Sequence, residues 1–126
     1  ARVRLQAFEF FTANGLAHVV HQGGVDPFDA RHPYYVVAEF DAADDVQQAA
    51  GLAAFEACAE AGWVLDGVIA QSQAQAQQLW RLREGITEAV ARYRPYKNDV
   101  SVRVGAMAAF LARAQALLGE AYQEAQ

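Results

Sequence analysis

Three side chains in the second half of the sequence have the chemistry needed to bind a carboxylate. Arg83 and Thr87 are four residues apart in a stretch with helical periodicity, so they share one face of the expected helix, beside its apolar stripe. Arginine offers a planar fork of donors, threonine adds a hydroxyl donor, and Lys97 contributes a mobile positive charge. Together these three groups could hold an organic acid.

The stretch KNDVSVRV begins at Lys97 and alternates polar with apolar residues. In a β-strand this alternation gives one apolar face of valines and one polar face. The polar face would consist of Lys97, Asp99, Ser101 and Arg103. Two explanations stay open, a strand with a solvated outer face or a polar face that lines a site for an anionic ligand.

Arg83 also has an alternative role, because exposed arginines commonly form ion pairs on the protein surface. Its candidate partners in that case are Glu84, Glu88 and Asp99.

The composition is that of an acidic globular protein. The chain has 126 residues, 54% hydrophobic and 20% charged, which suffices for a single domain over residues 1–126. The net charge of -5 argues against a nucleic-acid partner, because phosphate backbones require a concentrated excess of lysine and arginine. Basic residues nevertheless gather between Arg81 and Arg103, and such a local patch suits a small anion.

Other features bear on location and on metals. No apolar run is long enough for a transmembrane segment and no signal peptide is visible, so a soluble, cytoplasmic protein is expected. Cys58 is the only cysteine, which suits a reducing compartment. The three histidines do not supply enough convergent donors, so no metal site is expected. The chain opens on Ala1, which suggests either a piece of a longer polypeptide or a processed N-terminus.

Strands and helices are expected to alternate along the chain. Aromatic, β-branched or alternating residues indicate strands at 5–11, 34–40, 63–72 and 94–104. Periodic apolar residues indicate helices over 43–61, 74–93 and from Met107 onward, with a short helical turn after residue 11. Asp41 is the expected N-cap and Gly62 the expected C-cap of the first long helix. Because the fourth strand alternates, we expect an α+β fold, an antiparallel β-sheet with helices packed on one face, of ferredoxin-like kind.

Four segments, in this order, resemble a known family. AFEFF and DPFDARHPYYVVAEF lie in the first third of the chain, and VIAQSQAQAQQLWRLREGITEA is followed by KNDVSVRV. They resemble the C-terminal, substrate-facing domain of FAD-linked oxidases of the D-lactate, D-2-hydroxyglutarate and glycolate dehydrogenase group. The resemblance covers almost the whole chain.

The resemblance implies a flavoprotein that oxidises a D-2-hydroxy acid to the 2-oxo acid by hydride transfer to FAD. In this family FAD is held mainly by a separate N-terminal domain, and the C-terminal domain forms a cap that orients the acid. Arg83, Thr87 and Lys97 match the family's carboxylate-binding positions, so the resemblance implies substrate binding there. Asp99 and Ser101 would support Lys97 or pack against the flavin domain. The implied partners are a 2-hydroxy acid and the FAD-binding domain of the same parent chain.

Departures from the family limit the expected role. The 126 residues contain no FAD-binding domain and no counterpart of the family's later histidine-rich segment, which is linked to a metal and to proton abstraction. No catalytic residue is therefore expected, and the isolated chain should be inactive. Arg103 stands where the family has proline in SVPV, which puts the local strand in question but not Lys97.

The alternative function is a non-catalytic α+β module that binds a small acid or forms a homodimer through its sheet. A piece of a larger enzyme should expose an apolar patch where its partner domain docks. A self-sufficient module should instead form an oligomer that does not depend on concentration.

Overall fold

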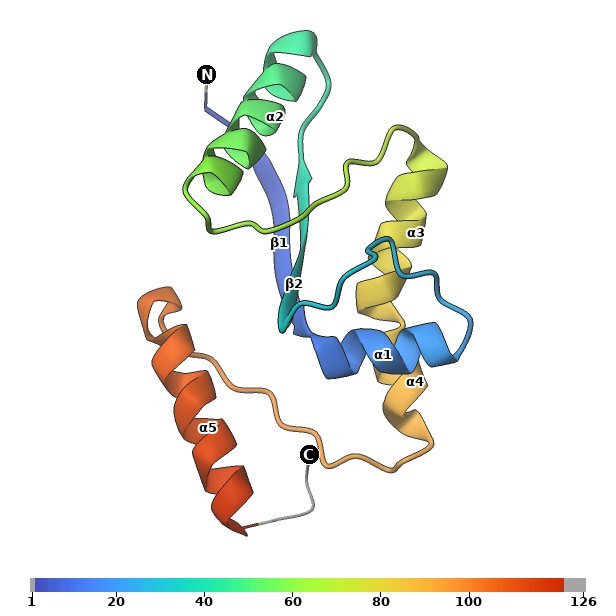
Figure 1. Ribbon diagram of the computed structural model, residues 1–126, viewed down its shortest axis with the longest axis vertical. Helices are drawn as coiled ribbons and strands as arrows, with labels where there is room; N and C mark the ends of the chain where they lie inside the picture. Colours follow the sequence, from blue (N-terminus) through green and yellow to red (C-terminus); the bar gives the residue numbers. More distant parts are fainter. Residues whose placement is uncertain (1, 122–126) are drawn as a thin grey trace. The chain divides into compact units, whose positions relative to one another are not determined.

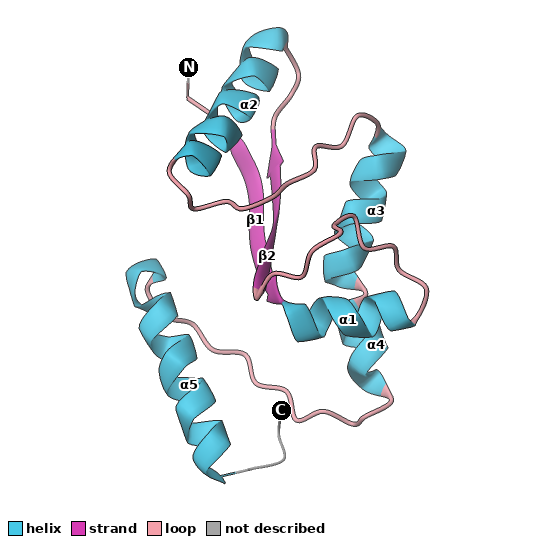
Figure 2. Ribbon diagram, in the orientation of Figure 1, coloured by secondary structure: helices cyan, strands magenta, loops and turns pink. Residues whose placement is uncertain are grey.

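The computed structural model describes residues 2–121, which form a two-stranded antiparallel sheet and several helices (Figure 1). The elements in chain order are β1 (Leu5–Thr12), α1 (Ala13–His21), β2 (Tyr34–Phe40), α2 (Asp45–Glu60), α3 (Gln73–Glu84), α4 (Ile86–Ala91), a 3-10 turn (Val104–Ala106) and α5 (Met107–Ala121) (Figure 2). The expected α+β class and antiparallel pairing are confirmed. The chain divides into two compact units, the first ending at Pro95 and the second beginning at Tyr96.

The sheet has two faces of different environment. Side chains alternate along each strand, and the register pairs Glu9 with Val37 and Phe11 with Tyr35. The inner sheet face consists of Ala7, Glu9 and Phe11 from β1 and Tyr35, Val37 and Glu39 from β2. The outer sheet face consists of Phe8, Phe10 and Thr12 from β1 and Tyr34, Val36 and Ala38 from β2. Helix α3 contacts both strands and α1 continues directly from β1, as Figure 1 shows.

The core of the first unit lies between the inner sheet face and helices α1, α3 and α4. Its buried members are Phe11, Leu16, Val19, Tyr35, Leu82 and Ala89. The Phe11 and Tyr35 rings stack with their centroids 5.7 Å apart. Thr12 Oγ1 accepts a hydrogen bond from the Gly15 N–H, so α1 begins where β1 ends. The core therefore fixes the sheet-facing side of α3.

The helix expected at 74–93 is two helices, α3 and α4. Ser72 caps α3, because its Oγ accepts a hydrogen bond from the Gln75 N–H. Gly85 separates the two helices, as expected for a residue with poor helix propensity. Helix α2 agrees with the expected 43–61 helix, although Asp44 rather than Asp41 is its N-cap. Gly62 follows the C-cap residue Ala61 and has a φ of +73°, a conformation that favours glycine.

The strands predicted at 63–72 and 94–104 are wrong. Within the described residues, neither segment forms backbone hydrogen bonds with a neighbouring strand. Alternation shows which side chains would share a face, but a strand also needs a partner for its backbone groups. In the first segment the backbone at Gly67 passes so close to the Phe55 ring that an added Cβ would clash with it. This segment packs through a close approach to α2 rather than through the sheet.

Candidate functional site

Arg83 lies in the last turn of α3, on the side that faces the sheet. Its Nε is 2.9 Å from Oε2 of Glu9, a residue of the inner sheet face. The Nε–H does not point at a suitable acceptor among residues 2–121, so the contact is an ion pair without an aligned hydrogen bond. Glu9 was not among the ion-pair partners expected from the sequence. Within the first compact unit Arg83 pairs with Glu9 and not with the surface candidates Glu84 and Glu88, whereas a pairing with Asp99 stays a prediction.

A second glutamate of the inner sheet face also holds α3. Trp80 Nε1 donates a hydrogen bond of 2.7 Å to Oε2 of Glu39. Glu39 lies opposite Ala7 and Glu9 lies opposite Val37, so the two carboxylates extend from the same face on neighbouring strands. The sheet thus positions α3 through two polar contacts as well as through the core.

Thr87 is exposed and lies at the second position of α4, beyond the break at Gly85. Within residues 2–121 no hydrogen bond joins its hydroxyl to Arg83. The structure therefore leaves Thr87 free for a ligand, and its joint action with Arg83 stays a prediction.

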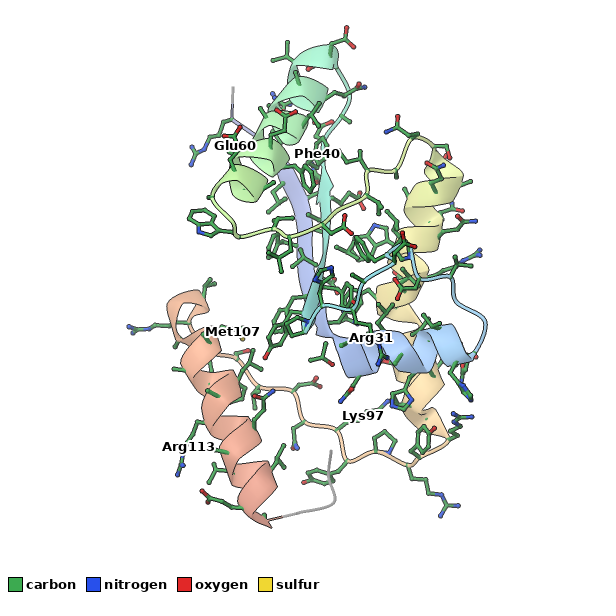
Figure 3. All side chains as sticks on the ribbon, viewed as in Figure 1. Arg31, Phe40, Glu60, Lys97, Met107 and Arg113 are labelled. Atoms are coloured by element: carbon green, nitrogen blue, oxygen red, sulfur yellow. The ribbon has the colours of Figure 1, made fainter. Side chains whose placement is uncertain are left out.

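Lys97, Asp99 and Ser101 belong to the second compact unit. They are exposed and lie in the irregular segment between α4 and the 3-10 turn, where Figure 3 labels Lys97. Within the part of the chain that the structure describes, none of them forms an ion pair or a side-chain hydrogen bond. The ammonium group of Lys97 is available to an anion, and its convergence with Arg83 stays a prediction.

Glu9, Glu39 and Trp80 are contacts of the candidate site that sequence reasoning missed. The sequence does carry a signal, because AFEFF and VVAEF each place one glutamate inside an otherwise apolar strand. Glu9 is two residues from Phe11, so a buried Phe11 places Glu9 on the inward side.

The histidines take part in aromatic packing. The His18 ring lies 5.2 Å from the Tyr93 ring, and the His32 ring packs at 6.2 Å from both Phe28 and Tyr35. Across residues 2–121, no three or more His, Cys, Asp or Glu side chains converge on a point where a metal could bind.

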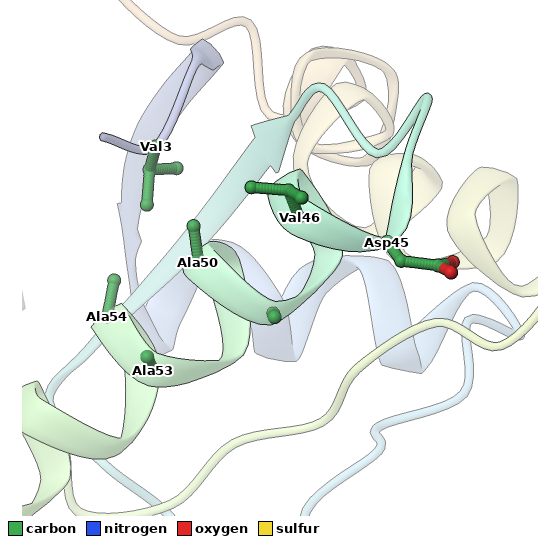
Figure 4. A pocket seen from close by; sticks show the side chains of 7 residues that line it. Val3, Asp45, Val46, Ala50, Ala53 and Ala54 are labelled. Atoms are coloured by element: carbon green, nitrogen blue, oxygen red, sulfur yellow. The ribbon is translucent and has the colours of Figure 1, made fainter. Parts of the chain in front are cut away.

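The hollow on α2 does not fit FAD. A hollow of about 630 Å³ lies on α2, as Figure 4 shows, and is lined by Val3, Asp45, Val46, Ala49, Ala50, Ala53 and Ala54. This lining offers a carboxylate and methyl groups, whereas a pyrophosphate needs donors or positive charge. Gly23 and Gly24 follow α1 and lead into a loop instead of opening a helix, so they form no phosphate-binding turn.

The outer sheet face is an exposed apolar surface. Its side chains are exposed by 63% at Phe8, 51% at Val36, 46% at Tyr34 and 37% at Phe10. Contiguous apolar surface of this kind is typical of an interaction site. A domain that docks against another protein part is expected to carry such a patch. In the described part of the chain, no helix has both the length and the apolar character to cross a membrane.

Comparison with known proteins identifies relatives along nearly the whole chain. The sequence is 66% identical over 98% of its length to a D-2-hydroxyglutarate dehydrogenase of Xanthomonas citri pv. viticola. It is 47% identical over 98% of its length to a D-2-hydroxyglutarate dehydrogenase of Stutzerimonas stutzeri. A mitochondrial D-2-hydroxyglutarate dehydrogenase of Arabidopsis thaliana is 40% identical over 79% of the chain. The chain spans about a quarter of the length of the two bacterial relatives and 19% of the plant one.

A family match agrees with these relatives. The description "FAD linked oxidases, C-terminal domain" applies to residues 1–125. The resemblance inferred from the four motifs is therefore confirmed, as is FAD as the cofactor of the parent protein. The parent family is one of oxidoreductases. The chain belongs to the FAD-linked oxidase C-terminal domain family.

Proposed function

We propose that this chain is the substrate-facing cap of an FAD-dependent dehydrogenase that oxidises D-2-hydroxyglutarate, a D-2-hydroxy acid, to its 2-oxo acid. The observation that carries the proposal is the 66% identity, over 98% of the chain, to a protein named for that activity. FAD supplies the two-electron acceptor in such an enzyme. The chain itself binds and orients the acid, and it is inactive alone because the FAD is held mainly by another domain of the parent protein.

Arg83, Thr87 and Lys97 are the proposed carboxylate-binding residues, with Asp99 and Ser101 supporting Lys97. Arg83 is partly exposed and Lys97 is exposed without an ionic partner among residues 2–121, so both can receive an anion. D-2-hydroxyglutarate carries two carboxylates, and two separate cations suit a dianion. Their contribution to the rate is to position the reacting carbon, which lowers the entropic part of the barrier.

The outer sheet face is proposed to dock against the FAD-binding domain of the same parent protein. An antiparallel sheet in water normally exposes polar residues on its free face, whereas this face presents Phe8, Phe10, Tyr34 and Val36. Both faces of the sheet are therefore suited to burial.

In the isolated chain the same face should cause weak self-association. We expect the average mass to rise with protein concentration, because pairing two outer sheet faces removes apolar surface from water. Phe8→Ser should weaken this association at least several-fold, since Phe8 is the most exposed side chain of the face. Sedimentation equilibrium over a range of concentrations measures both effects.

The matched control is Val25→Ser. Val25 is 81% exposed but lies in the loop after α1, outside the outer sheet face, so its loss should leave the association constant unchanged. A dimer whose mass does not change with concentration, and which tolerates Phe8→Ser, would contradict the docking role and favour an independent oligomerisation module.

Substrate preference tests the proposed activity. In the complete flavoprotein we expect kcat/KM for D-2-hydroxyglutarate to exceed that for D-lactate or glycolate by roughly ten-fold to a hundred-fold. The reason is the second carboxylate, whose charge-assisted hydrogen bonds contribute about 1.5–3 kcal/mol. Steady-state assays with one artificial electron acceptor measure the ratio. Equal kcat/KM for D-lactate would contradict D-2-hydroxyglutarate as the substrate.

A further inference from the structure

The guanidinium of Arg83 is held on one side. Its Nε is fully shielded from solvent and lies 2.9 Å from Oε2 of Glu9, yet the side chain as a whole is 35% exposed. The exposed surface therefore belongs to other atoms of the side chain. An incoming anion cannot reach Nε, so it must approach through the terminal nitrogens Nη1 and Nη2.

The partner of this arginine belongs to another element of the fold. Glu84 is its neighbour on the same helix, but the ion pair is made instead with a residue of β1. Glu9 extends from the inner sheet face, two positions from the buried Phe11. The β1–β2 pairing fixes the backbone of Glu9, although its side chain is 43% exposed. Its carboxylate attracts the Nε side of the guanidinium through charge, without an aligned hydrogen bond.

We propose that Glu9 is a positioning residue for substrate recognition, which rests on the proposed role of Arg83. Glu9 holds the Nε side of the guanidinium, so that Nη1 and Nη2 are directed toward the substrate carboxylate. Two terminal nitrogens can bind one carboxylate through two parallel hydrogen bonds. An arginine that is already oriented loses less rotamer freedom when the acid binds, and this strengthens binding.

The negative charge of Glu9 acts in the opposite direction, because it repels an anionic substrate. In the proposed complex the guanidinium would lie between the two carboxylates. The Glu9 side chain is 43% exposed, so water and salt screen the repulsion. We therefore expect orientation to have the larger effect, and removal of the Glu9 charge to weaken substrate binding.

A double-mutant cycle in the complete enzyme tests this role. Glu9→Gln preserves the shape of the side chain and removes its charge. We expect kcat/KM for D-2-hydroxyglutarate to fall about three- to ten-fold, mainly through KM, when Arg83 is present. In the Arg83→Ala background the same change should have less than about a two-fold effect, because the residue through which Glu9 acts is gone. Glu9→Asp, which keeps the charge, should recover part of the loss.

Glu39→Gln is the matched control. Glu39 lies on the same sheet face and also contacts α3, but its partner is Trp80. Any effect of Glu39→Gln on kcat/KM should be equal in the wild-type and Arg83→Ala backgrounds. Thermal unfolding of each variant identifies loss of fold. Arg83→Gln, which also removes the guanidinium and its charge, replaces Arg83→Ala if turnover of the double mutant is too slow to measure.

The possible results distinguish the role of Glu9 from the role of Arg83. If Glu9→Gln has the same effect with and without Arg83, then Glu9 has only a structural role. This result would overturn the inference about Glu9 and leave Arg83 in the proposed site. A rise in kcat/KM in Glu9→Gln would show that Glu9 competes with the substrate, which also overturns it. Unchanged kinetics in Arg83→Ala itself would remove Arg83 from the proposed site, and the role of Glu9 with it.

Discussion

Arg83→Ala in the complete enzyme is expected to lower kcat/KM for D-2-hydroxyglutarate by roughly ten-fold to a hundred-fold. The variant removes a charge-assisted hydrogen bond to the substrate carboxylate, a loss of about 1.5–3 kcal/mol. Arg83 can make this contact, because it is partly exposed and its one ionic contact within the first compact unit uses Nε, which leaves the terminal nitrogens for a ligand. Steady-state kinetics measures the change.

Arg81→Ala is the control for this variant. Arg81 is an exposed arginine of the same last turn of α3, two residues from Arg83 and therefore on a different side of the helix. Its loss removes the same formal charge and should leave kcat/KM within about two-fold of the wild-type value, because distant exposed charges are screened. If Arg83→Ala behaved like Arg81→Ala, Arg83 would have no part in substrate binding.

Lys97→Met is expected to give a loss of kcat/KM similar to that of Arg83→Ala, about ten-fold or more, without unfolding the protein. Methionine retains an apolar stem of similar length and removes the ammonium charge. Lys97 is exposed in an irregular segment, so the melting temperature should change little. Kinetics and thermal unfolding of the same preparation measure both quantities.

Arg103→Met is the matched control for Lys97. Arg103 is an exposed cation near the end of the same segment, at the N-cap of the 3-10 turn, and the proposed site does not include it. Its substitution should affect kcat/KM much less than that of Lys97. A large drop in the melting temperature of Lys97→Met, in place of a kinetic loss, would indicate a structural role for Lys97.

Local sequence patterns predict the elements whose structure depends on local interactions. Tyr34–Phe40 is a strand as predicted, and the helix from Met107 begins as predicted. Both follow from residue types and periodicity within the segment itself. The break at Gly85 and the cap at Asp44 depend on single backbone positions, which periodicity does not resolve.

Residues 63–72 and 94–104 show where local patterns fail. The alternation around Val100 and Val102 is that of a strand, yet within the described residues the segment has no hydrogen-bonded neighbour. Strand formation depends on a partner that is remote in sequence, so no local pattern can establish it. The ferredoxin-like subclass, the single domain over residues 1–126 and the cytoplasmic location also remain predictions.

The candidate site could be predicted in part. Family motifs identify Arg83, Thr87 and Lys97, and the helical spacing relates the first two. The ion pair with Glu9 was not predictable from spacing, since it joins β1 to α3 through the packing of the core. The nearer residues Glu84 and Glu88 were the candidates by sequence, but the side of α3 that packs on the sheet selects the partner instead.

The proposed role of this chain as the cap of a flavin dehydrogenase can be tested on the parent protein itself. The most direct measurement is made on the protein recovered from its native source with an antibody to this chain, by recording its mass and visible absorption spectrum. We expect a yellow protein much larger than 13.7 kDa, whose flavin absorbance bleaches when D-2-hydroxyglutarate is added. A colourless protein of 13.7 kDa would contradict it.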